Sequence, residues 1–182
     1  DIDLIVATIK EYRPFMISAV PTQFMRIAQE KVGKLNAIPM SGAAPLPREV
    51  ADGIKSELGN PVSEGYGLTE TSPLTHFNIS GFSKVTGFML KEKPGLGVPA
   101  PDTECKIIDP ATGQDMPFGE PGEILVRGPQ VMKGYWPKKG SGLTKEGWLK
   151  TGDIAFMDED GYFHMTDRSK DMINVSGNKV YS

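Results

Sequence analysis

The chain has 182 residues, of which 38% are hydrophobic and 24% charged, and its 20 basic and 23 acidic side chains leave a formal net charge of −3. This composition is typical of a globular domain; it shows no basic excess that would indicate a nucleic-acid partner, and no apolar run reaches the roughly 20 residues of a membrane span. A single cysteine, Cys105, excludes an internal disulfide and a cysteine-rich metal site, which favours a reducing compartment, the cytoplasm.

The first eighty residues alternate between helical and strand-like patterns. We expect, in chain order, a helix from about residue 4 that ends before Pro14, a strand at 15–20, a helix at 23–32, a strand at 35–40, a helix at 47–58 and a strand at 62–65. This order predicts βαβ units with a parallel sheet and right-handed crossovers. Ligands on such sheets bind beyond the carboxyl ends of the strands, where two loops rich in small residues, 41–44 and 64–67, are expected.

From about Gly95 the pattern changes to short strands separated by turns. The expected strands are 104–109, 122–127, 131–135, 152–157 and 162–167. The sequence Asp158-Glu159-Asp160-Gly161 predicts a hairpin between the last two. The predicted fold class is therefore α/β: a partial parallel βαβ sheet layer followed by a small β-barrel-like subdomain.

The segment 64–73 holds the first group of residues whose side chains suit ligand binding or catalysis. Gly65 and Gly67 allow backbone to approach a flat ligand, and the ring of Tyr66 between them can stack on a base. The Thr69 hydroxyl suits a phosphate oxygen, and the Glu70 carboxylate suits Mg²⁺. The alternative is a purely structural role, in which Tyr66 is a buried aromatic at the end of a strand and Thr69-Glu70 is the start of a helix.

Two further segments contain candidate ligand-binding residues, but each segment alone is weak evidence for such a role. Asp153, after the tight turn at Gly152, can accept the hydroxyls of a ribose, although Gly-Asp is usually only a turn. Arg168 can bind a ribose hydroxyl or a phosphate, but it also fits a solvated charge cluster that joins two domains.

These segments together resemble the acyl-adenylate-forming superfamily, which includes acyl- and aryl-CoA synthetases, peptide-synthetase adenylation domains and beetle luciferases. The likeness is carried, in this order, by Ser41-Gly42-Ala43-Ala44-Pro45-Leu46, by 65–71, by Pro121-Gly122-Glu123-Ile124, by Gly134-Tyr135-Trp136, by Thr151-Gly152-Asp153 and by Asp167-Arg168. Within the superfamily, 128–132 and 170–177 look most like medium- or long-chain fatty-acid–CoA ligases of bacteria or archaea.

The resemblance implies a nucleotide-binding role for each matching position. Gly42, Ala43 and Ala44 are expected to line the adenine, and Tyr66 to stack on its other face. The remaining implied nucleotide contacts are Glu64, Gly65, Gly67, Asp153 on the ribose hydroxyls, Arg168 and Lys170.

The catalytic positions implied by the resemblance are Thr69, which would hold the α-phosphate, and Glu70, which would bind Mg²⁺. Three parts are expected: 1–90 as the α/β part of the large domain, 91–166 as the β-barrel-like subdomain, and 167–182 as a hinge with the start of a C-terminal domain. Asn174 stands where many members have a lysine, and the phosphate loop and catalytic lysine of the family do not occur in these residues. We therefore expect a piece of a larger enzyme that is inactive by itself.

The reaction implied is that of an acyl-CoA synthetase: a fatty acid or other carboxylic acid reacts with ATP to give acyl-AMP and pyrophosphate, and CoA then forms the thioester. Mg²⁺ is the implied cofactor, with ATP and CoA as co-substrates. Two alternatives stay open, an adenylation domain that acylates a carrier protein and a non-catalytic nucleotide-binding module. The acyl chain length, peripheral contact with a membrane and a homodimer are also open.

Overall fold

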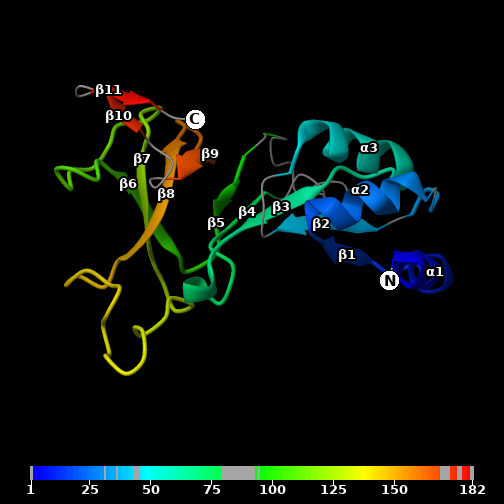
Figure 1. The fold of residues 1–182 in the computed structure, drawn as a ribbon, viewed down its shortest axis with the longest axis horizontal. Helices are drawn as coiled ribbons and strands as arrows, with labels where there is room; N and C mark the ends of the chain where they lie inside the picture. Colours follow the sequence, from blue (N-terminus) through cyan, green and yellow to red (C-terminus); the bar gives the residue numbers. More distant parts are fainter. Residues whose placement is uncertain are drawn as a thin grey trace. The chain divides into compact units, whose positions relative to one another are not determined.

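The computed structural model describes residues 2–30, 32–35, 37–42, 46–78, 93, 95–168, 173–175 and 178–180 (Figure 1). The chain divides into two compact units: Asp1–Tyr66 with Asn78–Lys93 form unit 1, and Gly67–Phe77 with Pro94–Ser182 form unit 2.

Unit 1 is built from alternating helices and strands. Its elements are α1 (Ile2–Tyr12), β1 (Met16–Ala19), α2 (Pro21–Gln29), β2 (Ile38–Gly42), α3 (Arg48–Leu58) and β3 (Ser63–Tyr66). β2 pairs in parallel with β1 on one side and with β3 on the other. The predicted βαβ arrangement is therefore confirmed.

Local chemistry explains where two of these elements differ from their predicted bounds. α2 ends at Gln29 instead of residue 32, shortly before Gly33, whose φ of +84° is unfavourable for residues with a side chain. β2 begins at Ile38 instead of residue 35, because the backbone N–H of Leu35 donates to Leu58 O at the end of α3 (3.1 Å) and not to a neighbouring strand. The predicted end of α3 at Gly59 is confirmed: Gly59 has φ +89° and caps the helix.

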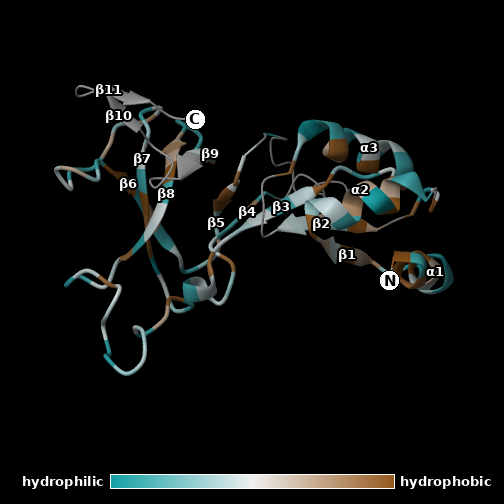
Figure 2. Cartoon of the chain, viewed as in Figure 1, coloured by the Kyte–Doolittle hydropathy of each residue, from teal (hydrophilic) through white to brown (hydrophobic). Residues whose placement is uncertain are grey.

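The core of unit 1 lies between the helices and the strands. Phe24 and Ile27 of α2 and Ile54 and Leu58 of α3 are almost completely buried. In Figure 2, α2 and α3 carry both hydrophobic and hydrophilic residues, as expected for helices with one buried side. Burial of each such side chain stabilises the fold by about 1.5–3 kcal/mol. No helix in the described ranges is long and apolar enough to cross a membrane.

Unit 2 is mainly antiparallel sheet. Its elements are the 3-10 helix η1 (Thr69–Thr71), β4 (His76–Asn78, whose last residue belongs to unit 1), β5 (Val98–Pro99), β6 (Glu104–Ile108), β7 (Gly122–Arg127), β8 (Leu149–Met157), β9 (Phe163–Arg168), β10 (Ile173–Val175) and β11 (Asn178–Val180). β6, β7, β8 and β9 form a four-stranded antiparallel sheet in that order. Buried Ile124, Val126, Ile154 and Phe163 form part of its core. The predicted change to short strands is confirmed.

One predicted hairpin is confirmed and one predicted strand is wrong. β8 and β9 are joined at Asp158, whose backbone N–H donates to Tyr162 O (2.9 Å) and whose Oδ1 accepts from the Asp160 and Tyr162 N–H groups. Residues 131–135, in contrast, form no strand. Gly134 has φ +124°, and the Met132 N–H donates to Glu70 O (2.7 Å), outside any strand ladder.

Candidate functional site

In unit 1, the carboxyl ends of β2 and β3 bring several predicted nucleotide-binding residues together. Gly42 and Gly65 are register partners, and a Cβ added to Gly42 would lie 3.5 Å from Gly65 O. Tyr66, which ends β3, is half-buried. This edge is the position at which parallel sheets bind ligands, as predicted. Ala43 and Ala44 lie outside the described residues.

Glu64 of β3 pairs in register with Ser41 of β2. Burial raises the pKa of the Glu64 carboxyl above its ordinary value, because an apolar environment disfavours the charged form; a hydrogen bond from the backbone of Leu46 acts in the opposite direction. The Glu64 side chain is therefore held within the sheet edge and is not a freely solvated charge.

In unit 2, the segment from Gly67 to Leu74 is a tightly folded turn. A Cβ added to Gly67 would lie 1.7 Å from Pro73 O, so only glycine allows this approach. The buried Thr71 accepts a hydrogen bond at Oγ1 from Leu68 N (2.9 Å), and the same hydroxyl lies 2.9 Å from Pro73 O. The turn presents Thr69 to solvent and holds Glu70 half-buried beside it.

Glu70 is held by a loop that lies some sixty residues further along the chain. Tyr135 donates its phenol hydrogen to Glu70 Oε1 (2.7 Å), and the Met132 N–H donates to Glu70 O (2.7 Å). The hydrogen bond from Tyr135 lowers the pKa of the Glu70 carboxyl and raises the pKa of the Tyr135 phenol. Glu70 is therefore ionised at neutral pH. Sequence reasoning missed Tyr135 in this role, because 131–135 was interpreted as a strand.

Asp153 and Arg168 lie on neighbouring strands of unit 2. They are register partners in β8 and β9, and a register shift follows directly between Ile154 and Ala155. The Asp153 side chain is buried, and its backbone N–H donates to Thr151 Oγ1 (3.1 Å). A bulge of this kind re-aims the side chains beside it. Arg168 is placed by its backbone alone, and Lys170 lies outside the described residues.

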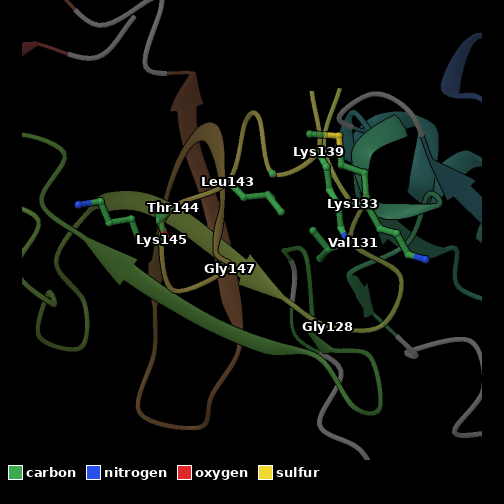
Figure 3. A pocket seen from close by; sticks show the side chains of 10 residues that line it. Gly128, Val131, Lys133, Lys139, Leu143, Thr144, Lys145 and Gly147 are labelled. Carbon is green, nitrogen blue, oxygen red and sulfur yellow. The ribbon is translucent and has the colours of Figure 1, made fainter. Parts of the chain in front are cut away.

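A pocket of about 400 Å³ is formed by the loop between β7 and β8. Its lining includes Lys133, Lys139 and Lys145 (Figure 3). In Figure 3 the Lys145 side chain extends away from the other two lysines. The three ammonium groups therefore do not converge on one point where an anion would bind.

His76 lies in β4 and is completely buried. Its Nδ1 lies 3.0 Å from Thr75 Oγ1, and its ring centroid lies 4.5 Å from that of Phe163. Burial lowers the pKa of His76 from 6.5 to about 3. The backbone of His76 pairs with Pro99 of β5, and its imidazole packs against Phe163 of β9.

Because His76 is neutral in the folded protein, stability should fall on acidification. Below about pH 6.5 the unfolded chain takes up a proton at this position, whereas the folded chain takes it up only near pH 3, so stability is lost as the pH falls through this window. We expect the free energy of unfolding to drop by about 2 kcal/mol more in the parent than in a His76→Gln variant between pH 7 and pH 5. Urea unfolding at both pH values measures this; equal drops would contradict it.

Cys105 is the single cysteine of the chain and is half-buried. Burial raises the pKa of its thiol to about 12, so little thiolate exists at neutral pH. The side chain lies in β6, paired with Val126 of β7.

The described residues include no group of three or more His, Cys, Asp or Glu side chains that could hold a metal ion. Mg²⁺ in nucleotide sites keeps several waters and takes one or two carboxylates together with substrate phosphates, so a single carboxylate can take part in such a site. The ionised, half-buried carboxylate of Glu70 is a suitable donor for such an ion.

Comparison with known proteins identifies the family. A model of the family "AMP-binding enzyme" matches residues 1–136, and the chain belongs to this family. The chain is 44% identical over 145 residues to a long-chain-fatty-acid–CoA ligase of Bacillus subtilis, covering 78% of this chain and 24% of the relative. It is 38% identical over 188 residues to a long-chain-fatty-acid–CoA ligase of Escherichia coli, covering 100% of this chain and 32% of the relative.

Solved structures of the family match the whole chain. The O-succinylbenzoate coenzyme A synthetase MenE of Bacillus subtilis, in complex with ATP and magnesium, has a TM-score of 0.84 at 31% identity, over 100% of this chain and 37% of that protein. ATP-bound MatB of Rhodopseudomonas palustris has a TM-score of 0.83 at 31% identity, over 100% of this chain and 36% of that protein. The fold and the family are thereby established, whereas the chain spans only about a quarter to a third of the curated relatives it matches.

Proposed function

We propose that the full-length protein is an AMP-forming acyl-CoA synthetase that acts on medium- or long-chain fatty acids. The observation that carries the proposal is the turn at 67–74, which holds an ionised Glu70 by hydrogen bonds to its side chain and its backbone. The similarity to fatty-acid–CoA ligases at 38–44% identity supports the substrate class. MenE is a synthetase named for another carboxylic acid, O-succinylbenzoate, so the shared fold alone does not select the substrate.

The chemistry follows from the weakness of a carboxylate as an electrophile. A carboxylate oxygen of the acid attacks the α-phosphorus of ATP, and the bond to pyrophosphate breaks. The acyl carbon of the resulting acyl-AMP then carries a good leaving group. The sulfur of CoA attacks this carbon, the thiol proton goes to solvent, and AMP leaves.

The adenine is proposed to bind at the carboxyl ends of β2 and β3. Gly42 and Gly65 allow the base to approach the backbone, and Tyr66 stacks on one of its faces. Further nucleotide contacts proposed are Glu64, Gly67 and the alanines at 43 and 44, of which the alanines lie outside the described residues.

The triphosphate is proposed to lie against the turn at 67–74. The Thr69 hydroxyl donates to the α-phosphate, and Glu70 holds Mg²⁺. The ion, when bound, neutralises negative charge that develops on the phosphates in the transition state. Thr71 keeps the turn in shape through its contacts with Leu68 and Pro73.

The ribose is proposed to be held by Asp153, with assistance from Arg168 on the neighbouring strand. Residues 167–170 would be the hinge between a large domain and a C-terminal domain that begins within 167–182, with Lys170 close to the nucleotide. The parts 1–90 and 91–166 would then be the α/β part and the β-barrel-like subdomain of that large domain.

The test is product analysis of the full-length protein with Mg²⁺-ATP, CoA and one acid at a time, from acetate to palmitate, with benzoate as an aromatic acid. We expect acyl-CoA and AMP in equal amounts, with the highest rate for a medium- or long-chain acid, and no product from the isolated 182-residue chain. Release of ADP, or AMP binding without turnover of any acid, would contradict the proposal. Transfer to a phosphopantetheinyl carrier protein in preference to CoA would contradict the choice of acceptor.

A further inference from the structure

The loop between β7 and β8 contacts Glu70 at two separate atoms. The Tyr135 hydroxyl donates to Glu70 Oε1, and the Met132 N–H donates to Glu70 O, both at 2.7 Å. One segment therefore fixes both the backbone and the side chain of the same residue. Gln130 of this loop adds a contact, because its Nε2 lies 3.4 Å from Leu74 O at the end of the turn.

Tyr135 is itself held in place by its neighbours in the loop. Its backbone N–H donates to Ser141 Oγ (2.9 Å), and the Ser141 hydroxyl lies 3.0 Å from Tyr135 O. Its ring lies over Gly142, where an added Cβ would come within 2.7 Å of a ring carbon. Although Tyr135 is 53% exposed, its backbone is held by Ser141 and its ring packs against Gly142.

A phenol is well suited to orient a carboxylate that binds a cation. Its hydroxyl donates one hydrogen bond and carries no charge, so it leaves the negative charge of the carboxylate in place, whereas a lysine or arginine would compensate that charge. A carboxylate has about four lone-pair positions, so one hydrogen bond leaves it able to act as a metal ligand.

We propose that Tyr135 is a positioning residue for Glu70: with its backbone bonded to Ser141 and its ring packed against Gly142, its hydroxyl holds the Glu70 carboxylate in the orientation that the nucleotide-bound Mg²⁺ requires. This inference rests on the proposed function, since it assigns a residue to the same site. In this role Tyr135 acts through Glu70, and we assign it no contact of its own with the nucleotide or the acid.

The first test is Tyr135→Phe in the full-length protein, with ATP binding measured by calorimetry in the absence of an acid. Loss of one hydrogen bond to a charged group should weaken Mg²⁺-ATP binding about tenfold. Binding of ATP in the presence of EDTA should be unchanged. Titration with Mn²⁺, followed by electron paramagnetic resonance, should show the same loss in affinity for the metal. Tyr12→Phe, which removes a phenol hydroxyl from the exposed end of α1, is the control and should change neither value.

A pair of glycine variants tests whether the close contact between the Tyr135 ring and Gly142 is needed. Gly140 and Gly142 have almost the same backbone conformation, with φ +81° and +82°, so alanine imposes the same backbone strain at both. Only at Gly142 does a new Cβ collide with Tyr135; at Gly140 nothing lies within 4 Å. Gly142→Ala should therefore reproduce the loss of Mg²⁺-dependent affinity, and Gly140→Ala should not.

Combination with Glu70→Ala separates this inference from the proposed function. If the inference holds, Glu70→Ala lowers Mg²⁺-dependent affinity, and Tyr135→Phe has no further effect in that background. A folded Tyr135→Phe variant with unchanged metal affinity, beside an impaired Glu70→Ala, would overturn the inference alone. Unchanged Mg²⁺-dependent affinity in Glu70→Ala would show that Glu70 does not bind Mg²⁺. That result would overturn both the inference and the proposed function of the site.

Discussion

Glu70→Gln in the full-length protein should lower acid-dependent ATP–pyrophosphate exchange by about 10²–10³-fold, the range found when one preorganised electrostatic contact to a transition state is lost. The amide keeps the shape of the side chain and an oxygen that accepts from Tyr135, but it removes the negative charge. Since the hydrogen bond from Tyr135 lowers the pKa of Glu70, the parent is fully ionised at pH 7. The comparison therefore isolates the charge that we assign to Mg²⁺ binding.

The control for Glu70→Gln is Glu120→Gln, which removes a carboxylate from an exposed loop of the same unit. We expect exchange to stay within a factor of two of the parent at this position. An equally small effect at Glu70, at saturating Mg²⁺ and ATP, would show that its carboxylate takes no part in adenylation.

Gly67→Ala should have the second large effect, because it disrupts the turn that presents Thr69 and Glu70. The new Cβ would lie 1.7 Å from Pro73 O and 3.0 Å from Leu74 Cα, which are backbone atoms that cannot rotate away. Such overpacking costs about 1–3 kcal/mol in stability. We expect at least a tenfold loss of Mg²⁺-ATP affinity together with a lower melting temperature, measured by calorimetry and thermal unfolding.

Gly53→Ala is the matched control for Gly67→Ala. Gly53 lies inside α3, and nothing lies within 4 Å of an added Cβ. Alanine should stabilise this helix by about 0.5–1 kcal/mol and leave ATP affinity unchanged. Equal affinities in the two variants would mean that the turn does not contribute to the nucleotide site.

The sequence predicts the parts of the fold that depend on local patterns. The βαβ order of unit 1, the cap at Gly59 and the hairpin at Asp158 all follow from apolar periodicity and turn residues. The proximity of Gly42 and Gly65 is also predictable, because the carboxyl ends of adjacent parallel strands meet at one edge.

The contacts of Glu70 are not predictable in this way. Val131 to Tyr135 alternates like a strand, yet Gly134 has φ +124° and the segment bonds to η1. Tyr135 and Glu70 are separated by 65 residues, and no local pattern encodes that pairing. The surroundings of His76 also depend on distant segments, since its backbone pairs with β5 and its ring packs against Phe163 of β9.

The most direct test of the account is ATP–pyrophosphate exchange by the full-length protein in the absence of CoA. We expect exchange that requires both Mg²⁺ and a carboxylic acid, because acyl-AMP forms reversibly before CoA binds. We also expect the highest rate with a medium- or long-chain fatty acid. Absence of exchange with every acid, in a folded protein that binds ATP, would contradict adenylation as its reaction.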